Sequence, residues 1–295
     1  MNSEYVVVCV CEQNIPDLFR NELKQILTHF KFVTKKAERK KKGLYYHVES
    51  QALDLPSLNA SLMNLASIHK IDIGCIPKNI FDAKKGLVVF DMDSTLITAE
   101  VIDEMAIRHG VGEQVKLITA RAMNGGLRFD QSLTERVALL KGFNRKHMED
   151  ILDKLVMTPG TPEFLKILNE LGIKTAIASG GFQYFAKSVQ EKLKIDYAFA
   201  NDLEFEADQL TGKILMPIVN AEAKEKIIMD LAAKENLSLT QVVAIGDGAN
   251  DIPMLLKAGL GIAIHAKEKV QKTANYRINF GPMTSALSFM NNEAL

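Results

Sequence analysis

The sequence predicts an α/β fold: a doubly wound parallel sheet with an inserted helical segment, preceded by a small α+β unit. Three short apolar runs, at 87–90, 173–178 and 241–245, each lead directly into a polar turn. Continuous apolar runs of this length indicate strands buried on both faces, as in a parallel sheet. Segments with helical spacing separate these runs, which favours a doubly wound sheet with right-handed crossovers.

Composition and charge indicate an ordinary globular protein. The chain has 295 residues, of which 47% are hydrophobic and 24% charged, which suits about two domains. Its formal net charge is zero, which argues against nucleic acid or an anionic membrane as a partner. No stretch approaches the ~20 apolar residues of a membrane span, and the opening residues lack a basic signal-peptide start. Three cysteines do not make a disulfide framework, so we expect a reduced, cytoplasmic protein.

The first eighty residues predict a unit with the order βαββαβ. The expected strands are 5–10, 31–36, 44–48 and 71–76, and the expected helices are 15–30 and 53–68. A charged turn at 37–43 would join the two middle strands. This order is typical of the ferredoxin-like sandwich, a common frame for small regulatory modules. We expect residues 1–80 to form one domain, with Pro77 to Ile80 as the linker.

Residues 81–295 predict the α/β domain. Helical spacing runs from Glu100 to about residue 155, with Gly125-Gly126 as a break. This stretch is too long for one crossover connection, so we expect an inserted helical cap at about 98–157. A hydroxyl, a proline and an acid at 161–163 mark the next helix start. The later expected elements are strands at 197–200 and 260–264, a hairpin at 203–218 with its turn at 208–212, and helices at 221–235 and 251–258.

Carboxylates follow two of the three buried strands. Asp91 and Asp93 come directly after the strand at 87–90, and Asp247 and Asp251 follow the strand at 241–245. Parallel strands end at one edge of the sheet, where ligands bind in open α/β proteins. Acids gathered there repel one another unless a cation lies among them. Because hard oxygen ligands suit Mg²⁺, especially with a phosphate completing its shell, we expect a magnesium and phosphate site.

Four motifs occur in a fixed order along this domain. They are Asp91-Met92-Asp93-Ser94-Thr95, Ser179-Gly180-Gly181, Lys224, and Gly246-Asp247-Gly248-Ala249-Asn250-Asp251. This set resembles the motifs of the haloacid dehalogenase (HAD) superfamily, and most closely those of its phosphoserine phosphatase family. The resemblance covers residues 85 to about 288, and includes Glu100, the cap segment 129–137 and the segment 197–201. Residues 1–80 look, in pattern only, like the ACT-type modules found on some bacterial members.

The resemblance implies hydrolysis of O-phospho-L-serine to serine and phosphate, the last step of serine biosynthesis. A carboxylate is ionised at pH 7, so Asp91 could attack phosphorus without a general base and form an aspartyl phosphate. Asp93 would protonate the leaving serine and then activate the hydrolytic water. Lys224 and the Ser179–Gly180 turn would cancel charge on the phosphoryl group.

The resemblance also implies a ligand set for Mg²⁺. Asp91, Asp247 and the backbone carbonyl of Asp93 would bind the metal. Asn250 and Asp251 would position Lys224, the metal waters and the phosphate. A lone lysine near a helix start is usually a solvated surface residue, and Lys226 is an alternative, but the position relative to the last motif favours Lys224.

Glu100 and Arg136 are the expected specificity residues of the cap. Phosphoserine carries an ammonium and a carboxylate beside its phosphate, so its pocket needs an anion and a cation. Structural alternatives remain, since Glu100 could complement its own helix dipole and Arg136 could be a surface arginine. Met123 and Phe129 are expected to close over the substrate and exclude water.

Two other functions stay open. A phosphotransferase, or a phosphatase for another small phosphoester, would share the Asp91 chemistry. An amino-acid-sensing protein would act through residues 1–80 with a vestigial catalytic site, although the intact set of catalytic residues argues against this. For residues 1–80 we expect a role in homodimerisation or in serine feedback.

Overall fold

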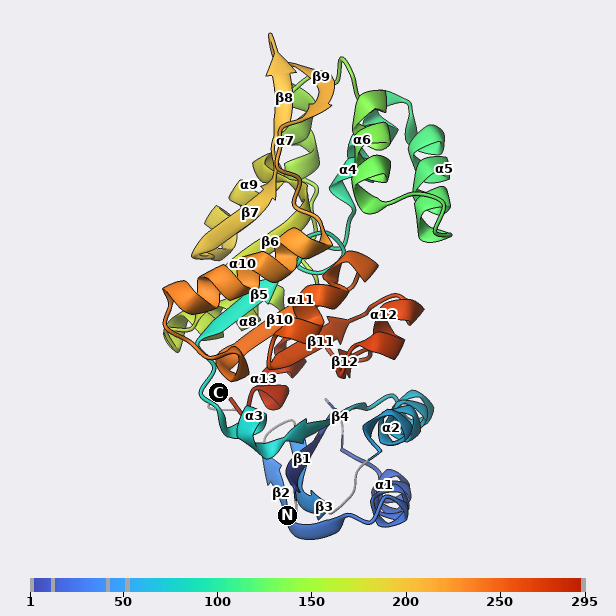
Figure 1. Ribbon diagram of the computed structural model, residues 1–295, viewed down its shortest axis with the longest axis vertical. Helices are drawn as coiled ribbons and strands as arrows, with labels where there is room; N and C mark the ends of the chain where they lie inside the picture. The colour runs from blue at the N-terminus through green and yellow to red at the C-terminus, as the bar shows by residue number, and fades with distance from the viewer. Residues whose placement is uncertain (1–2, 12–13, 41–42, 51–53, 293–295) are drawn as a thin grey trace.

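Figure 1 shows three tiers along the long axis of the molecule: an N-terminal sheet, a central α/β sandwich and a helical insertion. The computed structural model describes residues 3–11, 14–40, 43–50 and 54–292. In this part of the chain, no helix combines the length and apolar character that crossing a membrane requires.

The central tier is a six-stranded sheet in the order β12-β11-β10-β5-β6-β7, and every neighbouring pair is parallel. The predicted parallel sheet is therefore confirmed. The prediction lacked the three-residue edge strand β12. The strands are β5 (Leu87–Phe90), β6 (Lys174–Phe182), β7 (Tyr197–Asn201), β10 (Val242–Gly246), β11 (Leu260–Ile264) and β12 (Tyr276–Ile278).

Alternate residues of β5 are buried on opposite faces of this sheet. Leu87 and Val89 join a cluster with the helices α10 (Ala221–Lys234) and α11 (Ile252–Lys257). Val88 and Phe90 join a cluster with α8 (Thr161–Glu170) and α9 (Gln183–Leu193). All four side chains have no exposed surface. Because helices cover both faces, the strand is apolar at every position, which explains its continuous apolar run.

The helical insertion is the part of the chain between β5 and β6 that precedes α8. Its helices are α4 (Val101–His109), α5 (Gly112–Met123), α6 (Phe129–Leu139) and α7 (Lys146–Leu152). The chain enters and leaves the insertion side by side, because Ile97 and Met157 form an isolated β-bridge. A hairpin of β8 (Leu203–Glu206) and β9 (Gln209–Ile214) contacts the insertion. At this contact Gly142 N donates a hydrogen bond to Leu210 O at 2.7 Å.

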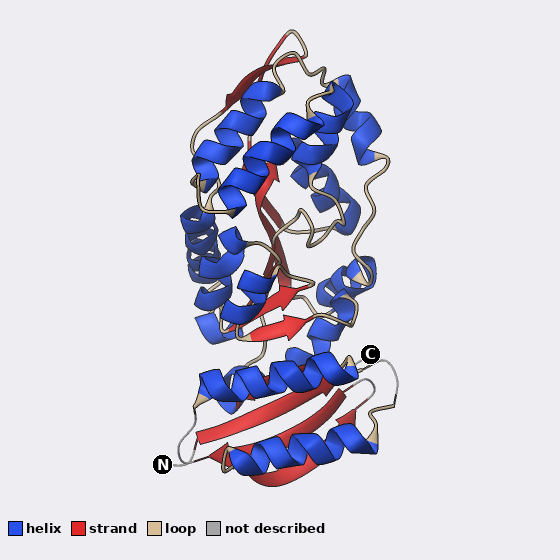
Figure 2. Cartoon of the chain, turned by 90° about the vertical axis from the view of Figure 1, so that its right-hand side faces the viewer, coloured by secondary structure: helices blue, strands red, loops and turns tan. Residues whose placement is uncertain are grey.

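The N-terminal sheet has the order β2-β3-β1-β4 with antiparallel pairs, so the predicted ferredoxin-like order is confirmed. Its strands are β1 (Ser3–Val10), β2 (Val33–Lys40), β3 (Gly43–Ser50) and β4 (Asp72–Pro77). Figure 2 shows α1 (Asp17–His29) and α2 (Leu55–His69) on one face. Val7 and Cys9 of β1 pack under these helices. Val6 and Val8 point the other way and join the core of the central tier.

Three predicted connections were wrong. Residues 37–40 continue β2 instead of turning, and 41–42 lie outside the described residues; charged residues are common on an edge strand such as this one. The hairpin turns at Ala207–Asp208, where φ is 45° and 63°, so Gly212 lies inside β9. The expected linker holds the end of β4 and the short helix α3 (Lys78–Asp82).

Asp72 joins the N-terminal sheet to the central tier. It lies at the start of β4 and is 3% exposed. Its Oδ1 accepts hydrogen bonds from Asn279 N at 2.7 Å and Phe280 N at 3.2 Å, and its Oδ2 accepts from Gly281 N at 2.9 Å. Burial raises the pKa of Asp72, and the three backbone donors oppose that shift.

Substitution of Asp72 should therefore destabilise the junction between the tiers. Asp72→Ala leaves three partly buried N–H groups without their charged acceptor, and we expect the free energy of unfolding to fall by about 2–3 kcal/mol. Asp82→Ala is the matched control, since Asp82 forms a half-exposed ion pair with Lys78 and such pairs contribute little. Urea unfolding of both variants measures the difference. Equal, small losses would contradict this role of Asp72.

Candidate active site

The strand β5 carries Asp91 and Asp93 to the carboxyl edge of the central sheet. Asp91 N donates to Ile245 O of β10 at 2.9 Å, which continues the ladder between the two strands into the turn. The carbonyl of Met92 then accepts from the N–H groups of the next turn, including Leu96 N at 2.9 Å. Asp91 is 6% exposed and Asp93 8%, so both acids are buried where the strand ends.

Lys224 lies between two of the buried acids. Its Nζ donates to Asp91 Oδ1 and to Asp251 Oδ1, both at 2.6 Å, and its side chain has no exposed surface. Burial disfavours the ammonium form, but the carboxylates of Asp251 and Asp91 outweigh burial and raise the pKa of Lys224. The alternative lysine, Lys226, has a side chain that is 74% exposed and pairs with Asp230. The structure thus brings Lys224, and not Lys226, to the acids.

The turn after β10 supplies Asp247 and Asp251. Asp251 Oδ2 accepts from Gly248 N at 2.8 Å and from Asp247 N at 3.1 Å, so this carboxylate fixes the turn. A Cβ on Gly246 would lie 2.6 Å from Asp251 Oδ2, which is why the turn needs glycine there. Asp247 Oδ1 accepts from Thr95 Oγ1 at 3.2 Å. Thr95 therefore links the turns that follow β5 and β10.

The acids fit a divalent cation. Asp91, Asp247 and Asp251 each place one carboxylate oxygen within 4.8 Å of the other two. Burial, followed by the charge of Asp251, raises the pKa of Asp91 well above its usual range and that of Asp247 to about 7. One lysine does not balance this negative charge, and carboxylate oxygens are the ligands that hard divalent cations prefer. HAD hydrolases generally use such a metal, and this cluster is suited to one.

Asp93 is oriented differently from the other acids. Its Oδ1 accepts from Val101 N at 3.0 Å, at the start of α4, and its Oδ2 lies 3.5 Å from Ser179 Oγ. Burial, and next the nearby charge of Glu100, raise the pKa of Asp93 to about 7. A carboxyl group with this pKa is present in both protonation states near neutral pH, as acid and base catalysis requires.

The second motif faces Asp93 across the site. Ser179 is fully buried, and its Oγ accepts from Gly181 N at 2.9 Å. A Cβ on Gly180 would lie 2.7 Å from Phe129 Cζ and 3.5 Å from Asn250 Nδ2, so Phe129 of the insertion and Asn250 both reach this glycine. Asn201, which the prediction gave no role, holds the turn: its Nδ2 donates to Gly180 O at 2.9 Å.

Glu100 and Arg136 both lie on the insertion side of the site. Glu100 Oε1 accepts from Ser94 Oγ at 2.9 Å, and the Ser94 backbone is left-handed with φ 56°. Arg136 Nε donates to Ser132 O at 3.2 Å. Burial lowers the pKa of Arg136, while the charges of Asp103, Glu100 and Asp93 oppose the shift. Arg136 is also partly buried, so it is not a free surface arginine.

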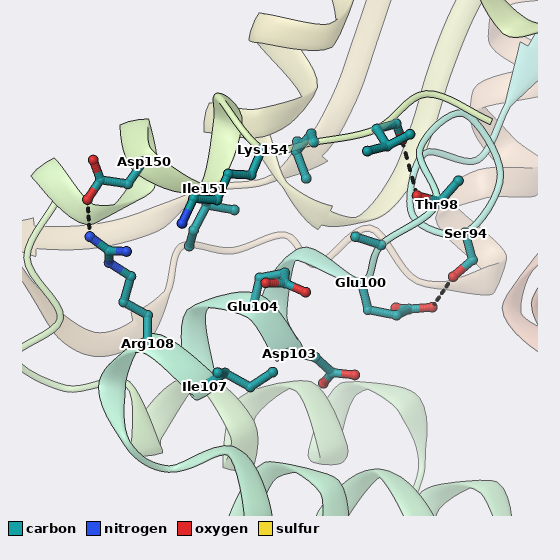
Figure 3. A pocket seen from close by; sticks show the side chains of 13 residues that line it. Ser94, Thr98, Glu100, Asp103, Glu104, Ile107, Arg108, Asp150, Ile151 and Lys154 are labelled. Carbon is teal, nitrogen blue, oxygen red and sulfur yellow. Dashed lines mark hydrogen bonds and ion pairs between the residues drawn. The ribbon is translucent and has the colours of Figure 1, made fainter. Parts of the chain in front are cut away.

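A cavity of about 640 Å³ opens beside Glu100 and Ser94 (Figure 3). Its lining includes Asp103 and Glu104 of α4, but not Asp91, Asp93 or Arg136. The cavity therefore lies on the Glu100 side of the site and does not include the reacting groups. Asp103 was missed in the prediction, although its position three residues after Glu100 places both on one face of a helix.

Met123 is the predicted site residue that the structure leaves outside the cluster. It ends α5 and is 66% exposed, so it does not cover the buried acids in this conformation. Gly125-Gly126, the predicted break, follows α5 directly and precedes α6.

Comparison with known proteins identifies the family. The family model of haloacid dehalogenase-like hydrolases matches residues 86–259. The chain is 46% identical over 209 residues to a phosphoserine phosphatase of Archaeoglobus fulgidus, covering 71% of this chain and 61% of that protein. It is 37% identical to a phosphoserine phosphatase of Saccharomyces cerevisiae, covering 97% of this chain and 95% of that protein.

A solved structure extends the likeness to the whole fold. The crystal structure of a HAD family hydrolase from Salmonella enterica serovar Typhi superposes with a TM-score of 0.86 at 32% identity, and the match covers 99% of both chains. The N-terminal sheet is thus included in the match. The chain belongs to the haloacid dehalogenase-like hydrolases and, within them, to the phosphoserine phosphatase family.

Proposed function

We propose that this chain hydrolyses O-phospho-L-serine to L-serine and phosphate with Mg²⁺, as the last step of serine biosynthesis in the cytoplasm. One observation carries the proposal. A buried carboxylate, Asp91, is paired with the buried Lys224 at 2.6 Å at the carboxyl edge of the sheet. The near full-length likeness to a yeast phosphoserine phosphatase supports the choice of substrate.

In the proposed reaction, an Asp91 oxygen attacks phosphorus and the bond from phosphorus to the serine oxygen breaks. Asp93 gives its proton to that oxygen, which leaves an aspartyl phosphate on Asp91 and a carboxylate on Asp93. Asp93 then takes a proton from water, which attacks the phosphoryl group and frees Asp91. The pKa of Asp93, raised to about 7, supports both roles.

The ionised state of Asp91 depends on its neighbours. From the sequence, Asp91 was expected to be ionised at pH 7 without help. In the folded chain, burial and the other acids raise its pKa, whereas Lys224 lowers it. Mg²⁺ would be held by Asp91, Asp247 and the backbone carbonyl of Asp93, and would supply positive charge to the nucleophile and the phosphate.

Substrate selection is assigned to the insertion. We propose that Glu100 binds the ammonium group of phosphoserine and Arg136 its carboxylate, while Ser179, Gly180 and Asn250 bind the phosphate. The contact of Phe129 with Gly180 supports a role as an apolar cover. For Met123 this role requires the end of α5 to move inward, since Met123 is exposed here.

A panel of small phosphoesters tests the function. With Mg²⁺ present, phosphate release should be fastest from O-phospho-L-serine, and EDTA should stop it. Added homoserine separates transfer from hydrolysis, because a phosphotransferase would form a new phosphoester instead of free phosphate. Preferred cleavage of another phosphoester would contradict the proposed substrate.

Asp91→Asn is the catalytic control for this panel. The amide keeps the shape of the side chain but lacks the nucleophilic oxygen anion, so turnover should fall by about 10⁴-fold or more. Thermal unfolding should show a folded protein with a midpoint near that of the wild type. Substantial retained activity would remove Asp91 as the nucleophile.

Asp247 yields a prediction on pH and metal. Its pKa rises from the usual 3.8 to about 7 on folding, so between these values the folded chain holds a proton that the unfolded chain has lost. The stability of metal-free protein should therefore fall as the pH rises from about 4 to about 7. Asp247→Asn removes this titration, and in EDTA near pH 8 the variant should be more stable by roughly 2 kcal/mol.

Urea unfolding near pH 5 and near pH 8, with EDTA or with Mg²⁺, measures these effects. Mg²⁺ should stabilise the wild type at the higher pH and have little effect on Asp247→Asn. Equal stabilisation of both proteins by Mg²⁺ would show that Asp247 is not a ligand.

We further propose that residues 1–80 form a separate domain that pairs two chains or binds serine. The helix side of the N-terminal sheet has its own core, whose buried residues all lie between Val7 and Cys75. Val33, on the edge strand β2, and Ile68, on α2, are 57% and 63% exposed, and each offers an apolar side chain for contact with a second chain. Sedimentation should find a dimer, and Val33→Lys with Ile68→Lys should shift it towards monomer. A monomeric wild type that serine does not inhibit would remove this proposal.

A further inference from the structure

Two side chains at the start of α6 contact the central tier next to the active site. Phe129 lies over Gly180, and its neighbour Asp130 accepts a hydrogen bond at Oδ2 from Asn220 Nδ2 at 3.4 Å. We propose that Asp130 and Asn220 form a closure latch, which holds the helical insertion against the helix that carries Lys224. The latch deepens the proposed function, because it acts on the same site.

Asn220 serves both sides of this contact. Its Oδ1 accepts from Ala223 N at 3.0 Å, so it caps the start of α10. Its backbone carbonyl accepts from Lys224 N at 3.0 Å, in the first turn of the same helix. The amide group of Asn220 is left to donate to the insertion. A single side chain therefore connects the position of the insertion with the position of Lys224.

Apart from Asn220, the side chains around Asp130 stabilise its carboxylate little. Its Oδ1 is buried and accepts no hydrogen bond from any described residue. The guanidinium of Arg128 lies 3.9 Å from Oδ2, but the Arg128 side chain is 80% exposed, and such ion pairs contribute little. A buried carboxylate oxygen without a donor costs stability. Apart from its place in the first turn of α6, which suits the helix dipole, this carboxylate is therefore explained mainly by its contact with Asn220.

The latch is suited to opening. The hydrogen bond is long, and it joins two side chains, whereas the chain crossing at Ile97 and Met157 is held by backbone bonds. Opening would separate Asp130 from Asn220 and lift Phe129 from Gly180 without breaking that crossing. The hairpin of β8 and β9, which is bonded to the insertion through Gly142 N and Leu210 O, would move with it. Closing would cover the Ser179–Gly180 turn and exclude water from it, which strengthens the electrostatic contacts inside the site.

Two substitutions open the latch in different ways. Asp130→Ala removes the acceptor. Asn220→Ser keeps a capping oxygen for α10, but its side chain is too short to reach Asp130. Both should lower kcat/KM for phosphoserine by about tenfold, the size expected for one lost hydrogen bond to a charged group. Both should also speed hydrogen exchange across 126–139, with unfolding midpoints close to the wild type.

Two further variants separate the latch from local structure. Asn220→Ala removes the helix cap as well, so it should lower the unfolding midpoint in addition to opening the latch. Arg128→Ala removes the exposed ion pair with Asp130 Oδ2 but leaves the hydrogen bond from Asn220, so exchange and kcat/KM should stay at wild-type values.

Exchanging the two side chains, so that position 220 carries the acid and position 130 the amide, gives the decisive comparison. Asn220→Asp alone keeps the cap but places two carboxylates against each other, and it should open the latch. Combined with Asp130→Asn it restores one donor and one acceptor, so exchange and kcat/KM should return to within about threefold of the wild type. Unchanged exchange in Asp130→Ala and Asn220→Ser, or a double variant no better than Asn220→Asp, would overturn the proposal. If the wild type does not hydrolyse phosphoserine, the proposed function fails, and the exchange data still decide the latch.

Discussion

The active site depends on one buried lysine between two buried carboxylates. Lys224 reaches Asp91 and Asp251 at 2.6 Å, and Asp247 lies in the same cluster. Burying several like charges together is unfavourable unless each finds a partner, and one ammonium does not neutralise three carboxylates. The negative charge that remains makes this sheet edge suitable for a divalent cation. Because of this excess of negative charge, the ionisation of Asp91 depends on whether a cation occupies the site.

The central sheet makes this crowding possible. β5 and β10 are parallel neighbours covered on both faces, so their carboxyl ends are held in fixed positions and deliver their acids to one point. Residues of the turns then fix the positions of the individual side chains. Asp251 uses one carboxylate oxygen to fix its own turn, and the other to hold Lys224. Thr95 ties the two turns together.

In the proposed function, chemistry and substrate selection come from different parts of the molecule. The sheet edge carries the reacting groups, whereas Arg136 and Phe129 come from the insertion. Glu100 stands at the junction, where Ser94 hydrogen-bonds it to the turn that holds Asp93. In the proposed reaction, the contacts between insertion and sheet at Gly180 and Asn220 hold the two parts of the site together.

The sequence by itself determined the parallel sheet, the N-terminal ferredoxin-like order and the meeting of Asp91, Asp93, Asp247 and Asp251. These follow from local patterns, because apolar runs mark buried strands and parallel strands end at one edge. Edge strands and turns were predicted less well. The charged residues at the end of β2 and Gly212 in β9 are also typical of turns, so both segments were predicted as turns although they belong to strands.

The motif order favoured Lys224 over Lys226, and only the tertiary structure gave the physical difference between them, because Lys224 is buried against the acids whereas Lys226 is exposed. It also revealed the acceptor role of Asp72, the link through Asn201 and the contact of Asp130 with Asn220. Each of these joins residues far apart in the chain, and a hydrogen bond between distant segments leaves no periodic trace in the sequence. Local sequence patterns predict that the acids lie at the edge of the sheet, whereas long-range packing determines which residues each acid contacts.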